Sequence, residues 1–158
     1  MSQTRTSGAS DRQRLAALRR FLLFTAMTGV TGMGLELIFV GHVADWLQWV
    51  PIVLLACGLA ALARHTWRPT RASAQGVRLM MALFIASGLL GVALHFRGNR
   101  EFELEMYPAM AGIELMRKTL TGATPVLAPG SMALLGLAGL AAVHGFSPGQ
   151  DINEENAS

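Results

Sequence analysis

The chain has 158 residues, of which 52% are hydrophobic and 15% charged, and its formal net charge is +3. Soluble domains usually carry about a quarter charged residues, so this composition favours a membrane protein of one domain. The weak net charge, without a basic stripe interleaved with aromatic residues, argues against nucleic-acid binding. The single cysteine, Cys57, excludes a disulfide within the chain.

Four apolar segments follow one another along the chain, each close to the roughly 20 residues that a transmembrane helix needs. They cover residues 20–40, 46–64, 78–96 and 124–146. We therefore predict an all-α fold, a polytopic membrane protein with a four-transmembrane-helix bundle over residues 19–146. The flanking polar stretches, residues 1–18 and 147–158, are predicted to be disordered, the first basic and the second acidic.

Turn-forming residues predict where two of these helices begin. Asp45 followed by Gln48 has the spacing of a capping box, which would start the second helix. Pro129 and Gly130 lie inside the fourth segment, where they predict a kink or a later start of the helix.

The distribution of basic residues predicts the orientation of the chain in the membrane. Nine arginines lie in the N-terminal tail or between the second and third segments, and four basic residues lie between the third and fourth. Because short basic segments tend to remain in the cytoplasm, we expect both termini on the cytoplasmic side. The loops between the first and second helices and between the third and fourth are then outside.

The outer segment between the third and fourth helices is too long for a simple turn. Residues 108–121 have apolar side chains at spacings of three and four, which predicts a short amphipathic helix on the outer membrane surface. Before it, residues 101–106 alternate between acidic and apolar. If extended, they would place Glu101, Glu103 and Glu105 on one face, although the stretch is short enough to be a helical turn.

Two of the predicted helices carry a stripe of small and polar residues. The stripe of the first helix is Thr25, Thr28, Gly29, Gly32 and Glu36, and that of the third is Ser87, Gly88, Gly91 and His95. Small residues let membrane helices approach closely, so we expect both stripes to face the bundle interior. Packing alone explains the glycines and the serine. Glu36 and His95, at similar predicted depth near the outer boundary, indicate a functional site instead.

Carboxylates and imidazoles gather on the predicted outer side. The candidate metal ligands are Glu36, His42, His95, Glu101, Glu103 and Glu105. Nitrogen and oxygen donors of this kind suit a divalent metal ion such as zinc or manganese. Their spacing matches no strong metal motif. Salt bridges to Arg97, Arg100 and Arg117 are the alternative explanation for these charges.

Two outer stretches resemble a known group of sequences. The first runs from His95 to Glu103, with Pro108 and the later Ala128-Pro129-Gly130, and the second runs from Glu36 to Pro51, with Gly41-His42 and Asp45. Both are similar to a family of small four-helix bacterial inner-membrane proteins that has no assigned activity. The resemblance implies the inner (plasma) membrane as the location and the periplasm as the outside, and it implies no mechanism.

Three functions are consistent with these residues. The first is a non-enzymatic accessory or scaffold protein whose outer carboxylate and histidine surface binds an ion or a partner. The second is a small oligomeric transporter or channel subunit that uses Glu36 as a proton or cation site. The third, a metal-dependent membrane enzyme, ranks last because the sequence has no nucleophile–base pair or phosphate-binding loop. The expected partners are the lipid bilayer and either further copies of the chain or other membrane subunits.

Overall fold

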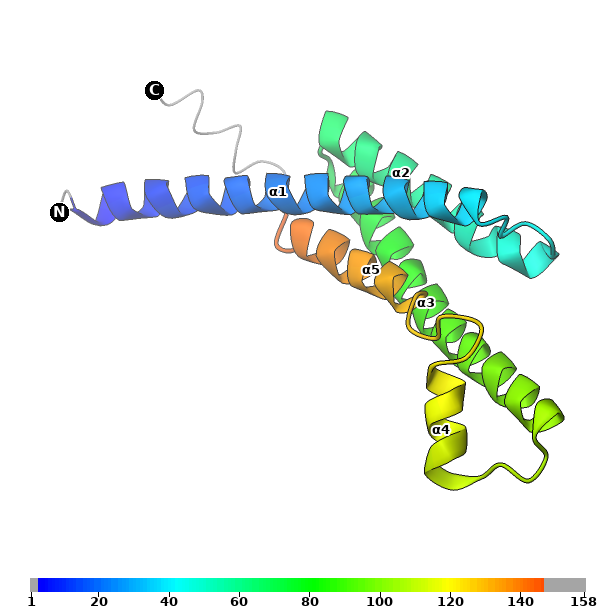
Figure 1. Ribbon diagram of the computed structural model, residues 1–158. Coiled ribbons are helices and arrows are strands. Elements are labelled where there is room, and N and C mark those ends of the chain that lie inside the picture. The colour runs from blue at the N-terminus through cyan, green and yellow to red at the C-terminus, as the bar shows by residue number, and fades with distance from the viewer. Residues whose placement is uncertain (1–2, 147–158) are drawn as a thin grey trace.

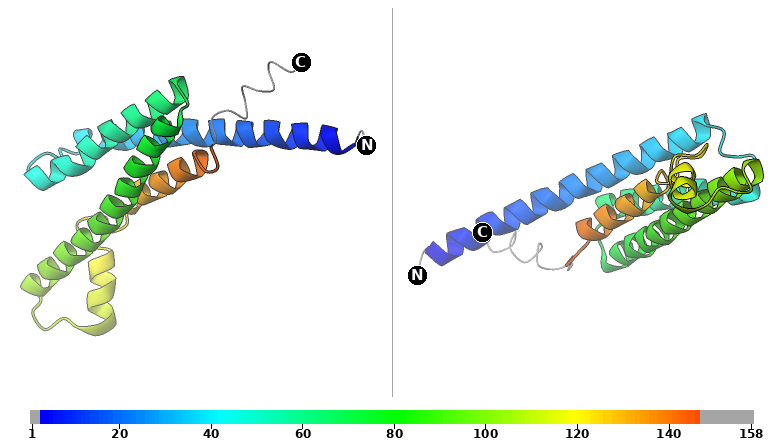
Figure 2. Two further views of the ribbon diagram at one scale, coloured as in Figure 1. Left: turned by 180° about the vertical axis from the view of Figure 1, so that it is seen from behind. Right: turned by 60° about the horizontal axis from the view of Figure 1, so that its bottom comes forward.

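The computed structural model describes residues 3–146, and between its turns this part of the chain is entirely helical. The helices are α1 (Gln3–Phe39), α2 (Trp46–Trp67), α3 (Arg71–Met106), α4 (Gly112–Leu120) and α5 (Gly130–Ala142). α1, α2, α3 and α5 pack together, whereas α4 lies beside the far end of α3 (Figure 1). The N-terminal part of α1 projects beyond the other helices in every view (Figure 2). The predicted all-α fold is confirmed.

Three of the helices are long and apolar enough to cross a membrane. These stretches are Gln13–Phe39, Trp46–Trp67 and Arg71–Met106. Helices of this length and composition are typical of a membrane protein. α5 has 13 residues. At a rise of about 1.5 Å per residue it is about 20 Å long, shorter than the roughly 30 Å of bilayer hydrocarbon. The fourth predicted crossing is thus present only as a short apolar helix between turns.

Two helices extend well beyond the segments predicted for them. α1 begins at Gln3, so residues 3–18, predicted to be a disordered tail, are helical. α3 begins at Arg71 because Thr70 and Ser73 form a reciprocal capping box, and it continues to Met106. Residues 101–106 are therefore helical and not extended. The predicted acidic tail, residues 147–158, lies outside the described residues.

The turn between α1 and α2 is built from a glycine and an N-cap. Gly41 takes a left-handed conformation with φ +70°, which glycine adopts without steric cost and which ends α1. Asp45 is the N-cap of α2 and accepts a hydrogen bond from the Leu47 N–H, as predicted. Gln48 Oε1 accepts from the Ala44 N–H at 2.9 Å, one residue before the N-cap. The capping box therefore forms in a variant in which Gln48 accepts from the residue before the N-cap and not from the N-cap itself.

Small residues let α3 and α5 approach closely. A Cβ atom added at Gly88 of α3 would lie 2.7 Å from the backbone nitrogen of Ala133, and one added at Gly136 of α5 would lie 2.7 Å from the Met81 carbonyl oxygen. Such backbone contact is common where small residues line membrane helices. Phe84, fully buried, fills the space between this contact and α2. The prediction that the α3 stripe faces the bundle interior is confirmed at Gly88.

Two arginines from neighbouring helices bind the C-terminal end of α5. Arg19 of α1 donates from Nη2 to the carbonyl oxygen of His144 at 3.0 Å, and Arg78 of α3 donates to that of Val143 at 3.1 Å. Each cation stabilises the negative end of a helix by about 0.3–1 kcal/mol. α5 therefore ends at the same end of the bundle as the start of α3 and the end of α2, which we call the arginine-rich end.

Candidate functional site

Two of the predicted metal ligands, His42 and His95, interact electrostatically. His42 lies in the turn after α1, and His95 lies on α3, where its Nδ1 is 3.1 Å from the carbonyl oxygen of Pro125. Partial burial lowers the pKa of His42 below its ordinary value, and the positive charge of His95 lowers it further. This environment favours the neutral imidazole at His42.

The acidic candidates do not gather around these histidines. Glu101 forms an ion pair with Arg97 at 2.7 Å, with both side chains largely exposed. Glu103 is buried and Glu105 is exposed. Because a helix has about 3.6 residues per turn, residues two apart point in nearly opposite directions. Within residues 3–146, no three His, Cys, Asp or Glu side chains are grouped in a way that could hold a metal ion.

Asn99 is a buried polar side chain that the sequence analysis did not single out. Its Nδ2 donates to the carbonyl oxygens of Thr119 at 2.9 Å and Thr124 at 2.8 Å. Its Oδ1 accepts from the Thr124 hydroxyl at 2.6 Å and from the Thr124 N–H at 3.2 Å. Asn99 thereby holds α3 to the end of α4 and to the linker before α5. Its spacing of four residues from both His95 and Glu103 was the signal that could have identified it.

A second polar cluster at the arginine-rich end was also missed. His65 of α2 is 4% exposed, and its Nδ1 is 2.8 Å from the hydroxyl of Ser73, which belongs to the capping box of α3. The ring of Phe146 packs edge-on against His65, with ring centroids 4.9 Å apart. His65 is thus a structural residue that joins α2, α3 and the chain after α5.

The stripe on α1 faces outward, contrary to the prediction. Thr25, Thr28, Gly32 and Glu36 are exposed, and we call this set the α1 polar face. A Cβ atom added at Gly32 would meet nothing within 4 Å. Gly29, at the edge of the stripe, is the exception, because an added Cβ there would contact Leu135 of α5. The side of α1 that packs into the core carries Ala26 and Val30 instead.

Glu36 is the most unusual residue of the α1 polar face. It lies in the last turn of α1, inside a stretch that is apolar enough to cross a membrane. Among the described residues its carboxyl group has no hydrogen-bond or ion-pair partner. Ionisable residues within membrane spans usually face a bundle interior or a water-filled cavity. Glu36 departs from this pattern, because its side chain is exposed on the outside of the helices.

Comparison of the chain with protein-family models, with curated proteins and with solved structures gives no match.

Proposed function

We propose that this chain is a multi-pass membrane protein without catalytic activity, which acts as an accessory or scaffold subunit and binds a partner's transmembrane helix on the α1 polar face. In this proposal, both termini lie on the same side of the membrane as the arginine-rich end. The observation that carries the proposal is the outward, unpartnered carboxyl group of Glu36 in a helix that is otherwise apolar enough to span the bilayer.

The shape of the α1 polar face suits a second helix. Thr28, Gly32 and Glu36 follow one another at intervals of four residues, so they lie along one line on α1. Small residues at this spacing let a neighbouring membrane helix come close enough for backbone contact. The open space above Gly32 is consistent with such an approach.

The charge of the face indicates what kind of helix binds there. The α1 polar face contains a carboxyl group and no Lys or Arg. In a symmetric parallel pair of α1 helices, the two Glu36 side chains would face each other, and like charges at close range are destabilising. We therefore propose a different membrane protein as the partner, with an Arg, Lys, His or neutral hydrogen-bond donor at the depth of Glu36.

Affinity purification from membranes in mild detergent tests this proposal. Gly32→Leu fills the space that the partner needs, and Glu36→Leu removes the carboxyl group while making the helix more apolar, so membrane insertion is retained. Gly34→Leu is the matched control, because an added Cβ at Gly34 also meets nothing within 4 Å but lies about 200° away around the helix. We expect the first two variants to recover about tenfold less partner, equivalent to about 1.4 kcal/mol, and the control to match wild type.

Other outcomes would contradict the proposal. Equal recovery of the same proteins with all three variants would show that the α1 polar face is not the binding surface. Recovery of only a second, differently tagged copy of the chain, lost in Glu36→Leu, would favour the oligomeric transporter or channel subunit in place of the accessory protein.

A further inference from the structure

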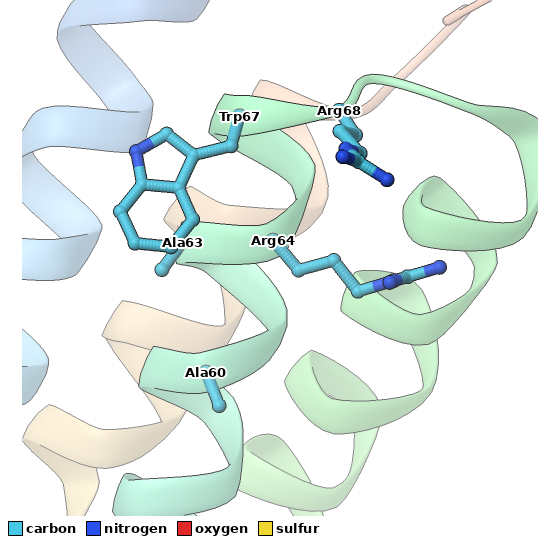
Figure 3. Close-up of a pocket in the computed structure, with 5 residues that line it drawn as sticks. All are labelled: Ala60, Ala63, Arg64, Trp67 and Arg68. Carbon is cyan, nitrogen blue, oxygen red and sulfur yellow. The ribbon is translucent and has the colours of Figure 1, made fainter.

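The last turns of α2 form an open hollow on the outside of the bundle. It has a volume of about 490 Å³ and is lined by Ala60, Ala63, Arg64, Trp67 and Arg68 (Figure 3). The spacing of these residues, in alternating steps of three and one, places their backbone positions on one side of α2. The other side of the same turns carries Leu62 and His65, which are buried. The hollow therefore opens to the outside of the bundle and not to its core.

The two arginines of the hollow have no anionic partner. Both side chains are exposed, and among the described residues neither forms an ion pair or hydrogen bond through its guanidinium group. Figure 3 shows the two groups on the same side of α2, directed toward α3, with the Trp67 ring on the other side. Arg78, another arginine of this end, is already bonded to the Val143 carbonyl. The hollow thus offers two guanidinium groups that lack an anionic partner among the described residues, on the side of α2 away from the Trp67 ring.

The position of the hollow along α2 matches the level of lipid headgroups. α2 has 22 residues. It is therefore about 33 Å long, close to the roughly 30 Å of bilayer hydrocarbon. If Trp46 and Trp49 lie at one boundary of the hydrocarbon, then Arg64 to Arg68 lie at the other. Trp67 is 84% exposed, and tryptophan is enriched at this level of membranes.

We infer that the hollow binds the phosphate group of an anionic phospholipid. Arg64 and Arg68 donate hydrogen bonds to the phosphate oxygens, which are the acceptors that guanidinium groups recognise best. Ala60 and Ala63 leave room for the start of an acyl chain. Basic pockets at the ends of transmembrane helices bind anionic headgroups in this way. This inference concerns α2 and does not depend on the proposed role of α1.

Thermal unfolding of the full chain in neutral detergent tests the inference with three additives: phosphatidylglycerol, phosphatidylcholine and inorganic phosphate. We expect phosphatidylglycerol to raise the Tm of the wild type by about 5 °C, since a ligand that binds only the native state stabilises it. The double variant Arg64→Gln/Arg68→Gln should retain less than about a third of that shift. The control Arg14→Gln/Arg20→Gln makes the same change in net charge at exposed positions of α1 and should retain all of it.

The same comparison separates the alternatives. Equal shifts in the two double variants would overturn the inference, because they would indicate attraction to the net positive charge only. An equal shift with phosphatidylcholine, or with inorganic phosphate alone, would overturn the assignment to an anionic lipid. Native mass spectrometry gives a second readout if the Tm of the first variant is already lowered. The wild type should keep at least about threefold more bound phosphatidylglycerol than Arg64→Gln/Arg68→Gln.

Discussion

Asn99 is the residue that determines how the segment after α3 is held. Four hydrogen bonds from one buried amide group connect α3 to Thr119 and Thr124, which are far away in sequence. A buried amide with all its partners is more stabilising than its individual bonds indicate, because its removal leaves buried carbonyl and N–H groups without partners. The position of α4 beside α3 follows largely from this side chain.

Asn99→Ala should therefore lower the free energy of unfolding by about 2–4 kcal/mol. The substitution should act locally at the Thr124 amide, because this amide donates to Asn99 Oδ1. Its hydrogen should exchange at least about tenfold faster in the variant. Hydrogen exchange measured by mass spectrometry checks this. Thr121→Ala is the control, because the Thr121 hydroxyl bonds only to the Arg117 carbonyl of its own helix. Unchanged exchange in Asn99→Ala would contradict the role given to this residue.

We expect His42 to make the stability of the fold depend on pH. Its pKa is lowered in the native state, first by burial and then by the charge of His95. The unfolded chain therefore takes up a proton at His42 near pH 6.5, where the native protein does not. Stability is retained above about pH 6.5 and is lost as the pH falls below it toward the native pKa.

The Tm of the wild type should consequently decrease between pH 7.5 and pH 5.5, and His42→Asn should show a smaller decrease. Thermal unfolding at several pH values in a detergent without titratable groups measures the difference. An identical pH dependence in the wild type and His42→Asn would show that this histidine does not contribute.

At the scale of the elements, the sequence predicted the helical segments more accurately than it predicted which side of each helix packs into the bundle. The apolar lengths identified α1, α2 and α3, and Asp45 was correctly expected to begin α2. The predicted ranges of α1 and α3 are shorter than the observed helices, because the predicted ranges stop where polar residues begin. In a helix longer than the bilayer is thick, such residues only mark where the hydrocarbon ends.

The orientation of α1 could not be obtained from its own residues. Periodicity shows which residues share a side, but α1 has apolar residues on several sides, so no contrast identifies the buried one. The core uses Ala26 and Val30, and the α1 polar face is left outside.

The candidate site was likewise predictable only in part. His42 interacts electrostatically with His95, whereas the helical conformation of residues 101–106 buries Glu103 and leaves Glu101 and Glu105 exposed.

The contact between α3 and α5 allows a direct test with two glycines of the same helix. A Cβ added at Gly88 would lie 2.7 Å and 2.8 Å from backbone atoms of Ala133 and Pro129, which cannot move without shifting α5. Gly88→Ala should therefore lower the free energy of unfolding by about 1–3 kcal/mol. Gly98→Ala, where nothing lies within 4 Å, should raise it by about 0.5–1 kcal/mol through helix propensity.

Reversible unfolding of both variants, followed by circular dichroism, gives this comparison. Equal effects of the two substitutions would contradict close backbone packing between α3 and α5.

At the scale of the whole molecule, the two ends of the bundle differ in their chemistry. The arginine-rich end holds α5 through Arg19 and Arg78 and carries the hollow of α2. At the opposite end, α3 extends beyond the bundle with α4 beside it (Figure 1). We propose that the chain crosses the membrane four times, with α5 and its flanking turns returning it to the arginine-rich side.

Cysteine labelling in sealed membrane vesicles tests that topology, with Cys57→Ser as the background. Single cysteines at Val43 and Ala109 should react with an impermeant reagent from one side only. Cysteines at Pro69 and His144 should react only from the other side. Labelling of a cysteine at His144 together with one at Val43 would show that α5 turns back within the membrane and that the chain crosses three times.

The central claim is that the α1 polar face binds a partner's transmembrane helix, and photo-crosslinking in intact membranes tests it most directly. A photoreactive residue placed at Gly32 or at Gly34 fits into open space in both cases and differs only in the side of α1 that it faces. We predict a crosslinked product with a second membrane protein from position 32, mapped to one of its transmembrane helices, and none from position 34. Crosslinks to lipid alone from position 32, or the same protein product from both positions, would contradict the claim.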